Sequence, residues 1–229
     1  MYSFKYNNEN VYFNYVLGDH IASEWKNKIF YEIRLLEKIK SLNLNGLYVD
    51  VGSHHGNHSI YFEKFCNSDK VISIEGNPFN FNYLKMNIAQ NKCKNILFNI
   101  IVSDKEGETL TMKYDMKNTG CSSVVNSKIN TSVKSKNYIN NTTTTLDNLL
   151  KNEENISLIK LDIENYEYYA LLGAQNIINK HRPVIIIELH RNNPYYREII
   201  NFLHKNKYKT DGISYAGSPT FIYVMDSVF

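Results

Sequence analysis

The segment from Leu47 to Gly56 constrains the fold of this chain more than any other part of the sequence. It begins as a short apolar run that carries one acid, Asp50, and it ends with two glycines, Gly52 and Gly56. This pattern is typical of a buried parallel strand that ends in a loop and leads into the next helix. Glycines in such a loop let the backbone come close to a ligand. The segment therefore predicts an α/β protein that binds a nucleotide-like small molecule.

The residues between the two glycines indicate which ligand the loop would bind. The sequence Gly-Ser-His-His-Gly lacks the Gly-x-Gly-x-x-Gly spacing of dinucleotide-binding turns. Asp50 would also place a carboxylate where a dinucleotide brings its pyrophosphate, and like charges repel. A ligand with a positive sulfonium and an ammonium group, such as S-adenosylmethionine, would be attracted instead. An NAD-linked oxidoreductase is the alternative, but it needs the tighter turn that this loop lacks.

A second acid, Glu75, ends the next expected strand, a little over twenty residues after Gly52. In doubly wound folds an acid at this place accepts hydrogen bonds from the ribose hydroxyls of an adenosine. Glu75 therefore indicates an adenosine-containing ligand, which both S-adenosylmethionine and NAD would satisfy.

Strand and helix patterns alternate along the rest of the chain. Strands that alternate with helices imply a parallel sheet wound by right-handed crossovers, with helices on both faces. We expect the last two strands to form an antiparallel hairpin. The expected strands are 47–51, 70–75, 95–102, 108–114, 157–162, 183–189, 207–213 and 219–225, and the expected helices are 57–66, 78–90, a short one opened by Thr145, 167–180 and 194–206.

The chain has 229 residues and no linker-like segment, which predicts one domain over 1–229. We expect residues 1–45 to form an N-terminal cap of strand and helix, with an amphipathic helix over 21–40. Residues 46–229 would form the Rossmann-like core. Within the core, residues 115–142 are polar and irregular, and they predict a surface loop.

Composition limits the classes of partner. The net charge is +3, and the lysines are scattered among acids, so no nucleic-acid partner is expected. No stretch approaches the roughly 18 apolar residues of a membrane span, so no membrane partner is expected. The three cysteines are odd in number and lack metal spacing, which is typical of a reducing compartment. These features predict a cytoplasmic protein.

Asp162, Glu164 and His190 are the candidate catalytic residues. Asp162 and Glu164 follow the expected strand 157–162, and His190 follows the expected strand 183–189. Ligands of open α/β sheets bind at this edge, and a carboxylate or histidine there could accept the proton of a reacting hydroxyl. Structural roles are the alternatives: acids complement a helix dipole, and a histidine can cap a strand end.

Three histidines near the glycine loop, His54, His55 and His58, could suggest a metal site. No acid accompanies them at ligand spacing. We therefore expect polar contacts to ligand or solvent from these residues and no metal.

Taken together, the segments resemble the FkbM-like family of class I S-adenosylmethionine-dependent methyltransferases. The resemblance covers most of the chain and depends on an ordered set of short motifs. One departure is Ser53-His54, where the family usually has Ala-Asn after the first glycine. The motifs are Tyr31-Glu32, Asp50-Val51-Gly52, Gly56-Asn57-His58-Ser59, Glu75 with Pro78, Asn87, Asn91, Ser103-Asp104 with Gly107, Asn118-Thr119-Gly120 with Ser122 and Ser123, Thr145-Leu146-Asp147, Lys160 to Glu164 with Glu167, Gly173-Ala174 and Pro183 to Glu188.

The resemblance implies a seven-stranded, mostly parallel sheet and O-methylation of sugars or of hydroxyls on natural products. S-adenosyl-L-methionine would be the cofactor and S-adenosyl-L-homocysteine its product. We expect an O-methyltransferase that acts on a hydroxyl of a sugar, nucleotide sugar or glycan; a non-catalytic binding module of the same fold is the alternative from another class. The expected cofactor-binding residues are Asp50, Gly52, Ser53, His54, Gly56, Asn57, Glu75, Ser103, Asp104 and Asp162.

Overall fold

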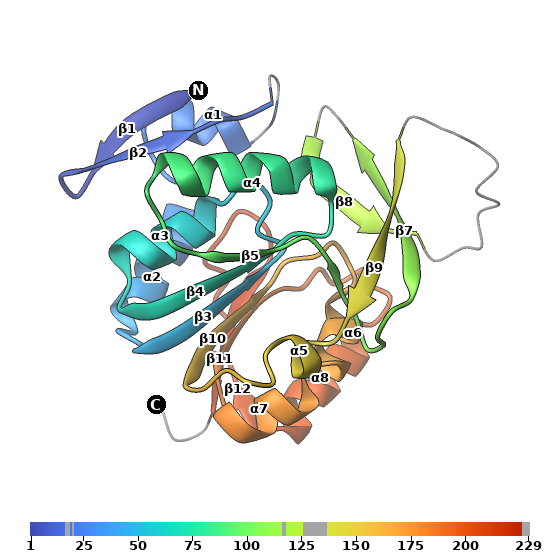
Figure 1. Cartoon of the computed structure of the whole chain (residues 1–229). Helices are drawn as coiled ribbons and strands as arrows, with labels where there is room; N and C mark the ends of the chain where they lie inside the picture. The colour runs from blue at the N-terminus through green and yellow to red at the C-terminus, as the bar shows by residue number, and fades with distance from the viewer. Residues whose placement is uncertain (17–18, 20, 116–117, 126–136, 226–229) are drawn as a thin grey trace.

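A seven-stranded sheet forms the centre of the molecule (Figure 1). The computed structural model describes residues 1–16, 19, 21–115, 118–125 and 137–225. In spatial order the sheet consists of β12 (Tyr208–Lys209), β13 (Thr220–Met225), β11 (Val184–Glu188), β10 (Ile156–Leu161), β3 (Gly46–Val51), β4 (Ser68–Ile74) and β5 (Ile96–Phe98). The strands from β11 to β5 are parallel, and β13 pairs antiparallel with both β11 and β12. The expected parallel sheet and terminal hairpin are confirmed.

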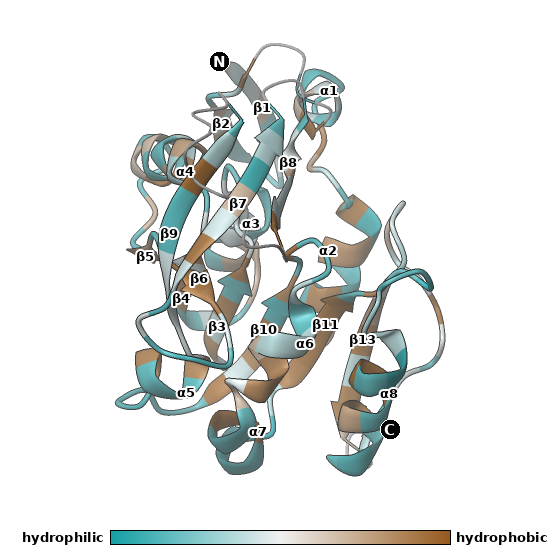
Figure 2. Ribbon diagram, turned by 90° about the vertical axis from the view of Figure 1, so that its right-hand side faces the viewer, coloured by the Kyte–Doolittle hydropathy of each residue, from teal (hydrophilic) through white to brown (hydrophobic). Residues whose placement is uncertain are grey.

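Both faces of this sheet are buried, because successive residues of its strands enter different apolar cores. Leu47 and Val49 of β3 belong to one core, and Tyr48 belongs to the other. Such burial on both faces is typical of parallel sheets. Figure 2 shows hydrophobic residues along β11 and β13, whereas α8 (Tyr196–Lys205) carries both kinds. The core that contains Tyr48 packs against α3 (Asn57–Phe65) and α4 (Pro78–Gln90). The core that contains Leu47 and Val49 packs against α5 (Leu146–Leu149), α6 (Glu167–Leu172), α7 (Gln175–His181) and α8.

The N-terminal residues form two strands and two helices, which we call the N-terminal cap. Strands β1 (Tyr2–Tyr6) and β2 (Glu9–Phe13) pair antiparallel beside α4 (Figure 1). The single helix expected over 21–40 is wrong, because α1 (Ile21–Lys26) and α2 (Ile33–Ser41) are separate. The amide of Asn57 accepts from the Tyr31 N–H at 3.1 Å and donates to the Tyr31 carbonyl at 2.9 Å. These two hydrogen bonds take the place of those that the backbone of Tyr31 would make inside a continuous helix.

A second, four-stranded sheet lies over the edge of the first. It has the order β6-β9-β7-β8, in which β6 is Ile101–Val102, β9 is Tyr138–Thr144, β7 is Thr109–Asp115 and β8 is Asn118–Val124. The expected strand 95–102 is therefore divided between two sheets. The interpretation of 115–142 as a surface loop is wrong for β8 and β9, and residues 126–136 lie outside the described residues. Most residues of β8 and β9 remain at least partly exposed, so these strands can carry polar side chains.

The helix expected over 167–180 is also divided, and Gly173 explains the break. A Cβ added at Gly173 would lie 2.0 Å from the carbonyl oxygen of Ser103. The carbonyl of Gly173 accepts from the Asp147 N–H at 2.8 Å, so its bond leads out of the helix. Among the described residues, no helix is long and apolar enough to cross a membrane.

Candidate active site

A cavity of about 330 Å³ opens at the carboxyl ends of the parallel strands. Its walls come from the loops after β3, β4, β10 and β11, and from the second sheet, mainly β8. Ligands of open parallel sheets bind at this edge. The structure brings together six of the predicted site residues in the lining of this cavity: Gly52, His54, Glu75, Asp162, Glu164 and His190.

The glycine loop closes one side of the cavity through its backbone. Gly52 has φ 82°, and a Cβ added there would lie 1.8 Å from the carbonyl oxygen of Asp162. Only glycine fits this close approach between the loops after β3 and β10. Gly56 has φ 92° and precedes α3. We call Gly52, His54 and Glu75 the glycine-loop side of the cavity.

Glu75 is buried and joins the end of β4 to this loop. One carboxylate oxygen accepts from the backbone N–H of His54 at 2.8 Å, and the other accepts from that of Asn77 at 2.8 Å. Burial raises the pKa of Glu75 to about 7, although the two N–H groups act in the opposite direction. Each oxygen retains a further lone pair for a hydroxyl of a ligand in the cavity.

Asp50 lies beneath the loop and does not line the cavity. It is fully buried and accepts from the Ser59 hydroxyl at 2.5 Å. Its other oxygen lies 3.4 Å from the ammonium of Lys160, which is also 3.1 Å from Asp162. Burial alone would lower the pKa of Lys160, but Asp162 and Asp50 outweigh it and raise that pKa. The lysine therefore compensates the charge of Asp50, a partnership that the sequence analysis did not identify.

Four titratable side chains meet on the opposite side, which we call the carboxylate side: Asp162, Glu164, Glu188 and His190. Burial raises the pKa of Glu188 to about 8 and that of Glu164 to about 7, and Asp162 adds to both shifts. Asp162 behaves differently. Burial would raise its pKa, but Lys160 outweighs this and lowers it. The imidazole of His190 lies 3.4 Å from Glu188, and almost half of that side chain is exposed.

The remaining predicted cofactor residues do not line the cavity. The Ser53 hydroxyl donates to the Asp50 carbonyl at 2.8 Å, and Asn57 supports the connection between α1 and α2. The Ser103 hydroxyl contacts Asp104 at 3.1 Å and the hydroxyl of Tyr166, a cavity residue, at 3.3 Å. Ser103 and Asp104 thus reach the cavity only through Tyr166.

The three histidines of the loop have different surroundings. His58 Nε2 lies 3.1 Å from Glu32. His54 and His55 stack on each other with ring centroids 3.7 Å apart. Burial lowers the pKa of His55 to about 4 and also lowers that of His54, so both rings are neutral near pH 7.

Sequence reasoning assigned no role to several cavity residues. Glu188, and Tyr31 with Glu32, were noticed only as parts of family motifs. Asn118 and Gly120 also belong to a family motif, but no site role was expected for the cavity residues of β8, because their segment was interpreted as a loop. These are Asn118, Gly120, Cys121, Ser122 and Val124.

The strand order, with one antiparallel strand next to the last, defines a Rossmann-like fold of the methyltransferase type. The family model described as the methyltransferase FkbM domain matches residues 50–210 of the sequence. The chain belongs to the FkbM methyltransferase family, so the resemblance found in the sequence is confirmed. None of the curated proteins compared with the sequence matches it.

The first of three similar solved structures supports the fold. The methyltransferase FkbM from Methylobacillus flagellatus KT has a TM-score of 0.52 and 17% identity, over 79% of this chain and 43% of that chain. The tRNA (uracil-54, C5)-methyltransferase of Pyrococcus abyssi, in complex with S-adenosyl-L-homocysteine, has a TM-score of 0.46 and 12% identity, over 84% and 36%. The precorrin-6y C5,15-methyltransferase of Geobacter metallireducens GS-15 has a TM-score of 0.48 and 12% identity, over 84% and 86%. This chain spans less than half the length of the first two.

Proposed function

We propose that this protein is an S-adenosylmethionine-dependent O-methyltransferase that acts on a hydroxyl of a sugar, nucleotide sugar or glycan. Membership of the FkbM family supports methyl transfer in preference to NAD-linked chemistry. The observation that carries the proposal is a single cavity with a ribose-type acid, Glu75, on one side and a group of proton acceptors on the other.

The glycine-loop side fits the adenosine part of this cofactor. Glu75 offers lone pairs for two ribose hydroxyls, and Gly52, which lines the cavity, lets the loops after β3 and β10 meet beside it. Beside Glu75 the lining is apolar, as the flat face of an adenine requires. The apolar residues are Ile74, Ile101, Val102 and Met112.

The carboxylate side fits the reacting hydroxyl. When bound, S-adenosylmethionine supplies a methyl group on a positively charged sulfur. The side chains of this protein would hold the acceptor oxygen in line with that methyl group and remove its proton. Holding two reactants in line can lower the activation free energy by about 7 to 11 kcal/mol.

The pKa shifts of the carboxylates assign these two tasks, orientation and proton removal, to different residues. Asp162 stays ionised beside Lys160, so it is a weak base that can orient the hydroxyl by accepting its hydrogen bond. Glu188 is the stronger base because its pKa is raised to about 8, and His190 at 3.4 Å can pass the proton on to solvent. Glu164 adds a further hydrogen-bonding group for a polyhydroxyl acceptor.

Binding and turnover test the proposal separately. Calorimetry with S-adenosylmethionine tests the glycine-loop side, and transfer of a labelled methyl group to a panel of sugars, nucleotide sugars and glycans tests the acceptor. Exchange of Asp162 for asparagine should raise the KM for the acceptor and leave cofactor affinity nearly unchanged. A folded protein that binds no S-adenosylmethionine would refute the proposed function, and binding without transfer to any hydroxyl would leave a binding module.

A further inference from the structure

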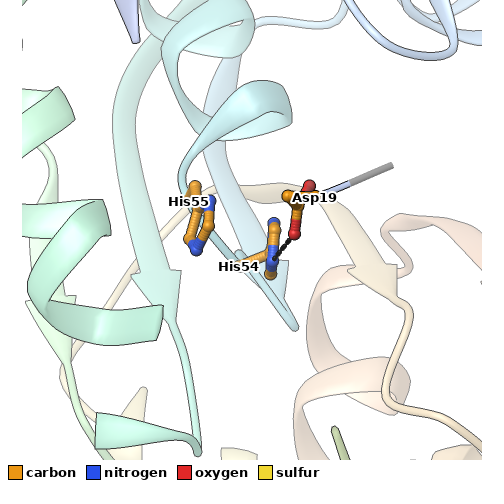
Figure 3. A group of neighbouring side chains, drawn as sticks. All are labelled: Asp19, His54 and His55. Carbon is orange, nitrogen blue, oxygen red and sulfur yellow. Dashed lines mark ion pairs between the residues drawn. The ribbon is translucent and has the colours of Figure 1, made fainter. Parts of the chain in front are cut away.

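Asp19, His54 and His55 come together beside the cavity from two distant parts of the chain (Figure 3). Asp19 precedes α1, and the two histidines lie in the glycine loop. One ligand atom from each residue lies within 4.8 Å of the other two. Asp19 Oδ2 is 3.8 Å from His54 Nε2. Asp19 is 5% exposed and His55 is fully buried, so water is largely excluded from this group.

The hydrogen bonds around this group leave lone pairs without donors. The Thr119 hydroxyl donates to Asp19 Oδ2, so it must accept at its 2.7 Å contact with His54 Nε2. His54 therefore carries its proton on Nε2, the nitrogen that lies 3.8 Å from Asp19 Oδ2, and a lone pair on Nδ1, so binding a metal through Nε2 would require that proton to leave. Among the described residues, His54 Nδ1 and both ring nitrogens of His55 have no hydrogen-bond partner.

Buried polar atoms in this condition are costly, because they have lost their hydrogen bonds to water and gained none in the protein. The side chain of Asn80 lies beside His55 and interacts with its ring, but its amide oxygen makes no hydrogen bond of good geometry to a described residue. The unpartnered atoms include several electron-pair donors, and a carboxylate lies beside them. A cation would satisfy these lone pairs together.

We propose that Asp19, His54 and His55 bind a divalent transition-metal ion of the Zn²⁺ type. Two imidazoles and one carboxylate are a ligand set that Zn²⁺ accepts, with a fourth position left open. Mg²⁺ and Ca²⁺ prefer sites made only of oxygen. The proposal does not depend on the proposed methyl transfer.

The geometry requires only a small rearrangement. Even if all three separations were 4.8 Å, bond lengths near 2.1 Å would need each ligand atom to move inward by about 0.7 Å. The two rings are nearly parallel, at 19°. Because a bound metal lies in the plane of each imidazole, one ring must turn about its Cβ–Cγ bond. Turning His55 would disturb its interaction with the side chain of Asn80, whereas turning His54 would break its contact with Thr119.

Such an ion would join the N-terminal cap to the wall of the cavity. Asp19 Oδ1 accepts from the Ile21 N–H at 3.0 Å and so fixes the start of α1. His54 lines the cavity and its backbone N–H holds Glu75. The sequence analysis expected no metal because it found no acid near the histidines; the acid comes from the N-terminal cap.

Metal binding can be measured directly on the whole chain. Chelator-treated protein should bind one Zn²⁺ per chain in calorimetry, and Co²⁺ in its place should give visible absorption bands of a low-coordinate site. His55→Leu and Asp19→Asn should each weaken Zn²⁺ binding at least tenfold, on the order expected for loss of a ligand or its support. His204→Leu, on the exposed face of α8, is the matched control and should bind as wild type does.

A second measurement separates metal binding from a packing role of the histidines. Without metal, His55→Leu should melt no lower than wild type, because it removes two buried polar atoms that lack partners. Added Zn²⁺ should raise the melting temperature of wild type but not of this variant. Absence of Zn²⁺ binding by wild type, or equal binding by His55→Leu and wild type, would overturn the proposal.

Discussion

The two sides of the cavity are built in different ways. On the glycine-loop side, backbone groups hold the structure: Gly52 allows two loops to touch, and Glu75 is held by two N–H groups. On the carboxylate side, Asp162, Glu164 and Glu188 lie close enough to shift one another's pKa. One side therefore depends on shape and the other on charge. A change of shape should affect binding and folding, whereas a change of charge should affect the rate.

The largest expected effect is at Gly52. Gly52→Ala would place a Cβ 1.8 Å from the Asp162 carbonyl oxygen at a φ of 82°. We expect the free energy of unfolding to fall by about 3 to 5 kcal/mol and binding of S-adenosylmethionine to be lost, as measured by thermal melting and calorimetry.

Gly107→Ala is the matched control for this prediction. Gly107 has a similar φ of 70°, but nothing lies within 4 Å of its added Cβ. Gly107→Ala should lower the free energy of unfolding by only about 1 kcal/mol, the cost of the left-handed backbone. If both variants lost the same stability, the contact of Gly52 with Asp162 would not matter.

The next effect concerns Glu188. Glu188→Gln removes the proposed base and should reduce single-turnover methyl transfer by about a hundredfold to ten-thousandfold, with little change in cofactor affinity. The exposed Glu198→Gln on α8 is the control and should react at the wild-type rate. A larger loss of rate in Asp162→Asn than in Glu188→Gln would assign the base to Asp162 instead.

A smaller effect is expected at Glu75. Glu75→Ala removes the acceptor for the ribose hydroxyls and should weaken binding of S-adenosylmethionine by about 1.5 to 3 kcal/mol in calorimetry. Glu75→Gln keeps one oxygen acceptor, so its affinity should fall between those of alanine and wild type. Wild-type affinity in the alanine variant would remove Glu75 from the cofactor site.

The smallest effect is the response to pH. Because the pKa of Glu188 is raised to about 8, this group is protonated at pH 6.5 and cannot accept a proton there. The single-turnover rate should therefore rise about twentyfold between pH 6.5 and 8.5. Cofactor affinity should change much less over this range. Glu188→Gln should flatten the rate profile; an unchanged slope in that variant would place the titrating group elsewhere.

Much of the fold was predictable because its signals are local. The run from Leu47 to Val51 is buried throughout and apolar except at Asp50, and the glycines that follow have the backbone angles that their residue type favours. The second sheet was not predictable in this way. In β9 the polar residues from Asn140 to Thr142 looked like a loop, and only pairing with β6 and β7 makes β9 a strand.

The site, like the fold, could be predicted only in part. Gly52, Glu75, Asp162, Glu164 and His190 follow strands, so their place at one sheet edge follows from the order of elements. Their protonation states do not follow from the order of elements, because a pKa depends on burial and on neighbours from other strands. Nothing in the sequence near Asp50 indicates that Lys160 compensates it.

The amino-acid sequence by itself determined the class of fold, the family and the sheet edge that carries the site, because periodicity, glycines and short motifs act over a few residues. Only the tertiary structure decided which acid stays ionised, which acid gains a proton, and that Asp19 meets His54 and His55. These properties arise between residues far apart in the chain, where distance and burial set the energy of each charge.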